Sequence, residues 1–269
     1  MAVSSAPGTL GEACVAVLRC GDPRAKLMAA RRAARDWRLG RLAHRFDDPP
    51  PDRPARPDAP ELLPPTRMPR RGKGGSLRAR IAMIHALAHI EFVAIDLAFD
   101  LLARFGGEFP PGFADDWLRV GADEAMHFAL LDRRLRALGS HYGALPAHDG
   151  LWDAARETAH DAAARLAIVP MVLEARALDI TPATMQRFEA VGDRETVRML
   201  GRIVADEVTH VAAGTKWFRW SMSRRGLNPQ ETYQKLVRTH FRGMLKPPFN
   251  GSARDEAGLT RDFYAPLAG

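Results

Sequence analysis

The apolar residues of this chain recur mostly at intervals of three and four positions, the spacing that places them on one face of an α-helix. Four long segments of this kind lie between residues 76 and 225, separated by glycine, proline and polar stretches. They predict helices over about 77–105, 113–138, 151–178 and 194–225. Ser76 is a favourable N-cap for the first helix, and Gly106, Gly139 and Gly226 mark helix ends. The predicted fold class is all-α.

Both flanks of this region carry further helical signals. Residues 9–45 contain two apolar segments, and Asp22 and Pro23 suit the N-cap and first position of the second. On the C-terminal side a helix is expected after Asn228, followed by a mostly irregular tail.

Residues 46–75 have a different composition, with nine prolines and several closing glycines. Proline lacks a backbone N–H and is excluded from helix interiors, so an extended strap or linker is predicted. Whether it wraps the helices or hangs free stays open, although Leu62, Leu63 and Met68 favour wrapping. The chain thus divides into four parts: an N-terminal helical extension (1–45), the strap or linker (46–75), a helical bundle (76–225), and a C-terminal helix with a tail packed on the bundle (226–269).

Two copies of Glu-x-x-His lie 83 residues apart, and two single glutamates in apolar segments repeat with the same offset. In chain order these six residues are Glu91, Glu124, His127, Glu174, Glu207 and His210. In each half, 33 residues separate the single glutamate from the glutamate of the Glu-x-x-His copy. That spacing suits a helical hairpin that brings both to the same height. The longer gap of 47 residues between the halves predicts a crossover between two hairpins, and part of residues 151–160 belongs either to this crossover or to the third helix.

This pattern predicts a site for two metal ions between four helices. Residues three apart share a helix face, so each Glu-x-x-His offers an oxygen and a nitrogen to one point. Four carboxylates balance the charge of two divalent cations, and mixed oxygen and nitrogen ligands favour iron or manganese over structural zinc. The expected cofactor is two iron ions, or an Fe/Mn or Mn/Mn pair. A single Glu-x-x-His more often combines a surface glutamate with a helix histidine, but two copies in register with two buried glutamates favour the metal site.

An aspartate precedes each Glu-x-x-His copy, at Asp123 and Asp206. A metal-bound histidine usually donates its other N–H to a carboxylate, which fixes the tautomer. We therefore expect Asp206 to hold His127 and Asp123 to hold His210 across paired helices. The alternative is that both aspartates are exposed charges, and the sequence leaves this open.

Other residues in the helical region invite a different interpretation. His85 and His89 point away from Glu91 by helical geometry, so we expect core or interface histidines that contact another helix, the strap or Asp96. Pro170, four residues before Glu174, is expected to kink the third helix, either beside a substrate pocket or as a bend in packing.

Two further expectations concern the same region. His160 lies too far along the third helix to reach the metals. Thr181 and Pro182 are expected to open a short helix that ends near Gly192.

The helical region as a whole resembles the ferritin-like di-iron carboxylate superfamily over residues 76–225. The stretches HALAHIEFVAIDLAFD, ADEAMHFALL, YGALPAHDGLW, VPMVLEARALDITP, ADEVTHVAAG and LKPPFNGSA are together similar to a bacterial ferritin-like family known only as a domain of unknown function. The resemblance implies a ferritin-like four-helix bundle and a dimetal site with all six ligand positions intact. It implies no substrate.

Composition narrows the context of these expectations. The chain has 46% hydrophobic residues, and no apolar run reaches the roughly 18 residues of a membrane span, so no membrane partner is expected. No secretory signal is expected at the start, and the two cysteines Cys14 and Cys20 do not form a disulfide framework, which together predict the cytoplasm. The net charge of +7 is spread along helix faces, so nucleic acid is an unfavoured but open partner.

These observations predict an oxidoreductase that uses dioxygen or peroxide on a small-molecule substrate, with an electron donor as a further partner. One branch of the resembled superfamily hydroxylates tRNA, so an RNA-modifying hydroxylase is an alternative. Iron handling of the ferroxidase type, without an organic substrate, is another. A non-enzymatic helical interaction protein is the last alternative. The sequence does not indicate the oligomeric state.

Overall fold

A computed structural model describes residues 8–69 and 75–269, and helices supply nearly all the regular structure in these ranges. The only extended pairings there are three isolated bridges, and no strand forms. The α-helices are α1 Leu10–Leu18, α2 Pro23–Arg38, α3 Leu77–Phe105, α4 Pro111–Ala137, α5 Gly150–Glu157, α6 Ala162–Ile168, α7 Ala175–Glu189, α8 Arg194–Arg225, α9 Pro229–His240, α10 Gly251–Glu256 and α11 Arg261–Tyr264. Three 3-10 turns, Pro65–Arg67, Gly106–Glu108 and Ala265–Leu267, and one π-helical segment, Val169–Glu174, complete the list.

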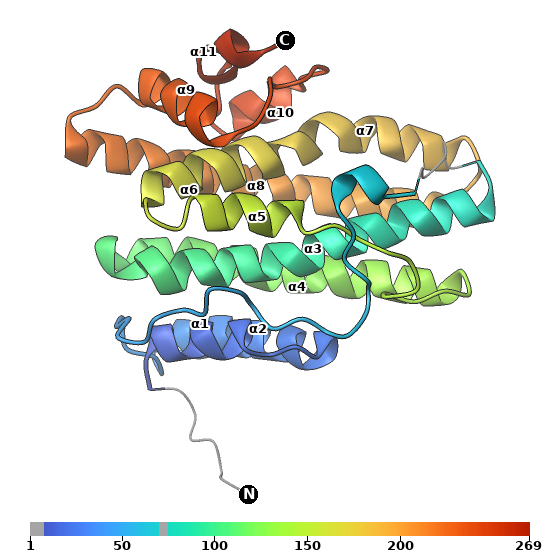
Figure 1. Cartoon of the computed structure of the whole chain (residues 1–269), viewed down its shortest axis with the longest axis horizontal. Coiled ribbons are helices and arrows are strands. Elements are labelled where there is room, and N and C mark those ends of the chain that lie inside the picture. The colour runs from blue at the N-terminus through green and yellow to red at the C-terminus, as the bar shows by residue number, and fades with distance from the viewer. Residues whose placement is uncertain (1–7, 70–74) are drawn as a thin grey trace, which may run out of the picture.

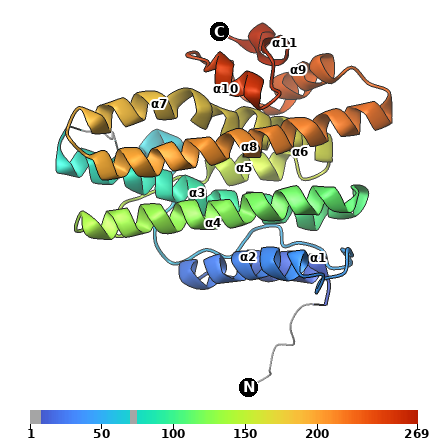
Figure 2. The ribbon, with the colours of Figure 1, turned by 180° about the vertical axis from the view of Figure 1, so that it is seen from behind.

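The helices are arranged in layers that run along the longest axis of the molecule (Figure 1). α3 and α4 form one antiparallel pair, and α6, the π-helical segment and α7 pair with α8. α1 and α2 cover the outer side of α3 and α4, whereas α9, α10 and α11 lie on the opposite side against the second pair (Figure 2). The two pairs form the middle of the molecule (Figure 1 and Figure 2).

Local sequence explains where the long helices begin and end. The Ser76 hydroxyl accepts a hydrogen bond from the Ala79 N–H at 3.2 Å, which caps α3. Asp22 caps α2 in the same way, with Pro23 at the first helical position. α8 ends at Gly226, whose φ of 65° is the left-handed conformation that glycine adopts without strain. These boundaries agree with those predicted.

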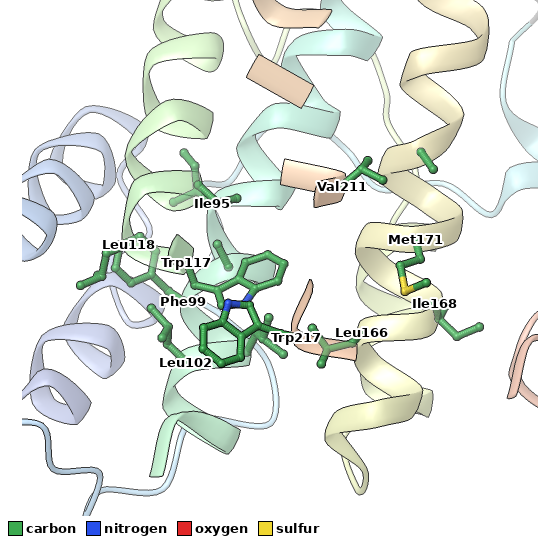
Figure 3. Close-up of a cluster of buried hydrophobic side chains, with 14 of the residues drawn as sticks. Ile95, Phe99, Leu102, Trp117, Leu118, Leu166, Ile168, Met171, Val211 and Trp217 are labelled. Carbon is green, nitrogen blue, oxygen red and sulfur yellow. The ribbon is translucent and has the colours of Figure 1, made fainter. Parts of the chain in front are cut away.

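The core between the pairs is filled by large apolar side chains. Figure 3 shows Phe99, Trp117, Trp217 and Leu166 among those that converge from α3, α4, α8 and α6. α3 and α4 approach closely at Gly121, where an added Cβ would lie 2.6 Å from the Phe99 ring. By length and composition alone, α3 is long and apolar enough to cross a membrane. Most of its most apolar 18-residue stretch is, however, buried inside the molecule.

The Pro-rich segment lies against the helices as far as residue 69. The Ala55 N–H donates to the Leu18 carbonyl, and Arg104 of α3 donates to the Pro51 carbonyl at 3.0 Å. Leu62 forms an isolated bridge with Ala147, in which the Leu63 N–H donates to the Ala147 carbonyl at 2.8 Å. The described part of the strap therefore wraps the bundle, while its predicted end at residues 70–74 and the start of the N-terminal extension at 1–7 lie outside the described residues.

The third long helix differs from the prediction. A helix over about 151–178 was expected, with part of residues 151–160 as an alternative part of the crossover; α5 ends at Glu157 and α6 begins at Ala162, so α5 belongs to the crossover. No helix opens at Thr181, because α7 runs through Pro182 to Glu189. The carbonyl that this proline leaves without an N–H partner belongs to Leu178, and it accepts a hydrogen bond from the Asn250 side chain at 3.1 Å. The tail that was expected to be mostly irregular also contains α10 and α11.

Candidate metal centre

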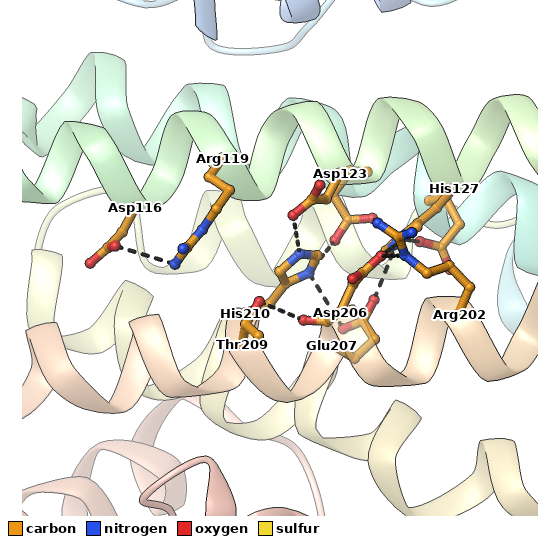
Figure 4. Close-up of polar contacts among 11 residues, drawn as sticks. Asp116, Arg119, Asp123, His127, Arg202, Asp206, Glu207, Thr209 and His210 are labelled. Carbon is orange, nitrogen blue, oxygen red and sulfur yellow. Dashed lines mark hydrogen bonds and ion pairs between the residues drawn. The ribbon is translucent and has the colours of Figure 1, made fainter. Parts of the chain in front are cut away.

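The six residues of the repeated pattern come from four neighbouring elements at the middle of the molecule. Their positions are Glu91 on α3, Glu124 and His127 on α4, Glu174 at the end of the π-helical segment, and Glu207 and His210 on α8. Five of them are at most 5% exposed, and Glu174 is partly exposed although its Oε2 atom is buried. Figure 4 shows His127, Glu207 and His210 between α4 and α8. The structure thus brings all six residues into one region.

One group of ligand atoms surrounds the Nδ1 atom of His127. This atom lies 3.2 Å from Glu91 Oε2, 3.5 Å from Glu124 Oε2 and 3.9 Å from Glu207 Oε1. Ligand atoms from these four residues all lie within 4.8 Å of one another, so a single cation can contact all of them. The group contains three carboxylates and one imidazole.

A second group surrounds the Nδ1 atom of His210. It lies 3.0 Å from Glu124 Oε1 and 3.8 Å from Glu207 Oε2. Glu174 interacts electrostatically with His210, Glu124 and Glu207. Glu124 and Glu207 therefore each direct one oxygen toward His127 and the other toward His210. Two carboxylates that each face two imidazoles are the arrangement that bridges a pair of cations.

The described residues leave several of these buried atoms without a hydrogen bond. They are both oxygens of Glu124, Oε2 of Glu174, Oε2 of Glu207 and both ring nitrogens of His210. His210 Nδ1 and Glu124 Oε1 are only 3.0 Å apart, but their geometry is not that of a hydrogen bond. A buried polar group without a partner costs about 1–3 kcal/mol, so such a cluster is expected only where something else satisfies it. Two divalent cations fit, because they balance four carboxylates.

In the metal-free protein, protons take the place of these cations. Burial, together with the charge of Glu124, raises the pKa of Glu91 and of Glu174 to about 8. Burial and neighbouring carboxylates also raise the pKa of Glu207 well above its ordinary value. Burial raises the pKa of Glu124 as well, but the close contacts and charges of His127 and His210 outweigh it and lower the pKa.

The two imidazoles hold protons for the complementary reason. Burial lowers the pKa of His127, but Glu124 and Glu91 outweigh it and raise the pKa to about 12. For His210, contacts with Asp123 and Glu124 likewise outweigh burial and raise the pKa well above its ordinary value. Metal binding must therefore displace protons from this site.

Asp206 and Asp123 lie behind the two imidazoles. The Nε2 atom of His127 is 3.1 Å from Asp206 Oδ2, which also accepts a hydrogen bond from Arg202 at 2.7 Å. The Nε2 atom of His210 is 3.5 Å from Asp123 Oδ2, too far for a strong hydrogen bond. A proton on each Nε2 leaves Nδ1 free to bind a cation. These are the pairs expected from the sequence, and the two contacts differ in strength.

The π-helical segment sets the position of Glu174. Pro170, which was expected to kink this helix, lies in the wider π-helical turn, where it packs against Gly214 of α8. A Cβ at Gly214 would lie 2.5 Å from Pro170, so only glycine permits this approach. Tyr233 of α9 donates to the Met171 carbonyl at 3.2 Å. Such π-helical turns occur often at functional sites, because they turn side chains away from regular helical positions.

The remaining histidines of the helical region lie outside the site. His89 contacts the Tyr142 hydroxyl at 2.9 Å and the His148 carbonyl, and His85 accepts from the Gly143 N–H. Both hold the loop after α4 against α3, as core or interface histidines do. His160 contacts the ring of His240 and lies away from the metal centre.

Asp96 does not contact either histidine, although that contact was considered from the sequence. It forms buried ion pairs with Lys26 of α2 and Arg56 of the strap. Asp100, one turn later, pairs with Arg104 at 2.8 Å and with Arg165 at 2.5 Å. Sequence reasoning missed these ion pairs; apart from Asp100–Arg104, which lies within α3, each links residues far apart in the chain.

Comparison with known proteins places the chain in a family. It is 39% identical to an uncharacterized protein of Haemophilus influenzae over 211 residues, which cover 76% of this chain and 73% of that protein. No solved structure matches the chain. The model of the family described as "Protein of unknown function (DUF455)" matches residues 19–265. The chain therefore belongs to the DUF455 family.

Proposed function

We propose that this protein is a dimetal-carboxylate oxidoreductase of ferritin-like architecture. Its centre binds two iron ions, or an Fe/Mn or Mn/Mn pair, and uses dioxygen or peroxide to oxidise a small-molecule substrate. The supporting observation is that Glu124 and Glu207 each present one oxygen to His127 and the other to His210. Such a ligand set suits two cations better than one.

The donor atoms support iron or manganese. Carboxylate oxygens and imidazole nitrogens are the ligands that these metals accept, whereas sulfur ligands favour zinc or copper. The two cysteines, Cys14 and Cys20, lie on and just after α1 and supply nothing to the site. Two redox metals in such a site supply electrons to dioxygen or peroxide when bound.

The chain itself positions the ligands and excludes water. Asp206 and Asp123 orient the imidazoles. Glu91 adds one carboxylate from α3, and Glu174 adds one from the π-helical segment. Ile95, Ala125 and Val211 are fully buried within one turn of a ligand, so the site is shielded from bulk solvent. Shielding strengthens electrostatic interactions in the site and protects reactive species from side reactions.

Metal analysis of the purified protein tests the proposal, together with an optical spectrum recorded without oxygen and then in air. We expect about two metal ions per chain, as dimetal bundles hold, and a spectral change on exposure to air. Glu124→Gln should remove both ions, because the Glu124 carboxylate directs one oxygen toward each imidazole and so contributes to both proposed metal positions. Glu189→Gln, at an exposed glutamate of α7, is the matched control. Iron oxidation without substrate consumption would favour the ferroxidase-type alternative.

A further inference from the structure

A second feature of the molecule lies where the C-terminal tail meets the π-helical segment. A cavity of about 380 Å³ lies between this segment, α7 and the loop at residues 241–250. Its apolar lining consists of Val172, Leu173, Phe241, Met244, Leu245 and Phe249. The sequence motif LKPPFNGSA forms much of the wall, although the metal centre makes no use of it. The size falls within the range of small-molecule sites.

Buried polar contacts hold this wall in place. Arg254 of α10 binds both oxygens of Asp179 on α7, at 2.8 and 2.6 Å, and both side chains are nearly inaccessible to solvent. The Asn250 N–H donates to the same aspartate at 2.9 Å. The cavity is therefore a built part of the fold, because the C-terminal end of the loop is bound to Asp179 of α7.

The charges at the cavity do not balance. Arg254 matches the single negative charge of Asp179. Arg176 lies 3.5 Å from the same carboxylate and donates to the carbonyls of Lys246 and Pro248, so two arginines share one negative charge. In the described part of the chain Lys246 forms no ion pair, and Arg242 pairs only at the surface. The Arg254 Nη1 atom is buried without a hydrogen-bond partner among the described residues. The lining thus offers excess positive charge beside an apolar wall.

The cavity is also adjacent to the metal centre along the chain. Leu173 lines the cavity and directly precedes Glu174, and Arg176 follows two residues later. A ligand in the cavity therefore contacts the same π-helical turn that positions a proposed metal ligand.

We propose that this cavity binds an amphipathic organic acid, with its carboxylate or phosphate at Arg176 and Lys246 and its apolar part against Leu173 and Phe249. Resting on the proposed function, this inference names that acid as the substrate class of the metal centre. Positive side chains recognise the anionic group, and the apolar wall contributes burial of the hydrocarbon part.

Calorimetric titration with octanoate, octyl phosphate and 1-octanol tests the binding. We expect both acids to bind at least tenfold more tightly than the alcohol, and the tighter acid identifies the preferred headgroup. Lys246→Glu should weaken acid binding at least tenfold, whereas Lys246→Arg should retain it. Lys235→Glu, which makes the same charge change at an exposed site on α9, is the matched control. Equal binding of alcohol and acids, or equal affinity of the two glutamate variants, overturns the proposal.

A second readout separates this proposal from the metal centre. In the metal-loaded protein, octanoate or octyl phosphate should change the optical spectrum of the metals, since both sites share the π-helical turn. If the metals bind and the spectrum stays unchanged at saturating acid, the substrate assignment is wrong while the metal centre stands. If no metal binds but acid binding still depends on Lys246, the cavity assignment holds and the proposed function fails.

Discussion

Two groups of buried acids share helix α3 and its neighbours, and they differ in how their charges are satisfied. Asp96 and Asp100 each lie between two basic side chains, Lys26 and Arg56 for the first and Arg104 and Arg165 for the second. One and a half turns earlier, Glu91 faces two other glutamates and an imidazole. Burial of acidic side chains therefore does not by itself indicate a metal site. Buried acids that have no lysine or arginine partner among the described residues do.

The two groups also suggest different roles. The basic partners of Asp96 come from α2 and the strap, so this group attaches the N-terminal extension to the bundle. The glutamates of the metal centre have no lysine or arginine partner among the described residues and face only one another and two imidazoles. We infer that the first group stabilises the fold and the second binds metal.

Asp96→Asn should produce the largest loss of stability. It leaves Lys26 and Arg56 buried with weaker partners, and breaking a buried ion pair typically costs about 3–5 kcal/mol. Urea unfolding measures this change. Asp47→Asn, at an ion pair that is exposed on both sides, should cost less than about 1 kcal/mol. Metal content should remain at the wild-type value in folded Asp96→Asn protein.

Glu207→Gln tests the other half of this comparison, namely that the acids of the metal centre do not stabilise the metal-free fold. Without metal at pH 8, the variant should be at least as stable as the wild type. The reason is that the wild-type Glu207 carboxylate has no basic partner other than the two imidazoles, which it shares with Glu124. Added iron or manganese should raise the melting temperature of the wild type but not of the variant. A metal-free variant several kcal/mol less stable than the wild type would assign Glu207 a structural role like that of Asp96.

Asp206→Asn should weaken metal binding by roughly 10–100-fold, the usual effect of removing such a carboxylate. Asp123→Asn should have a smaller effect, because its oxygen lies 3.5 Å from His210 rather than 3.1 Å as in the other pair. Competition with a chelator measures both affinities. Equal affinities of both variants and the wild type would show that these aspartates do not support the imidazoles.

The pH dependence of stability gives a smaller but specific effect. In the metal-free protein the pKa of Glu91 is raised to about 8, so the folded state holds a proton that the unfolded state has released. Its contribution to stability is present at pH 4.5 and is lost as the pH rises toward 8. Metal affinity should change in the opposite direction and rise with pH, because binding displaces this proton.

Thermal unfolding in the presence of a chelator measures this effect between pH 5.5 and 8. Lys26 and His89, whose pKa values are lowered mainly by burial, act in the opposite sense, so wild type and Glu91→Gln must be compared. The melting temperature of the wild type should fall relative to that of the variant as the pH rises. A constant difference would mean that Glu91 titrates normally.

The sequence predicted the features that depend on local signals. Helical periodicity, the cap at Ser76 and the stop at Gly226 are encoded within a few residues, and the 83-residue repeat linked the six site residues. Pro182 was misread as a helix start, because the side chain that compensates for it belongs to Asn250, far along the chain. The Lys26–Asp96 pair was missed for the same reason, since it joins residues 70 positions apart.

Anomalous X-ray diffraction from crystals of the protein grown with iron tests the central claim most directly. Two peaks are expected between α4 and α8, one beside the Nδ1 atom of His127 and one beside that of His210, at the roughly 3.5–4 Å separation of two-metal sites. Glu124 and Glu207 should contact both peaks. A single peak, or none among these six side chains, would contradict the account.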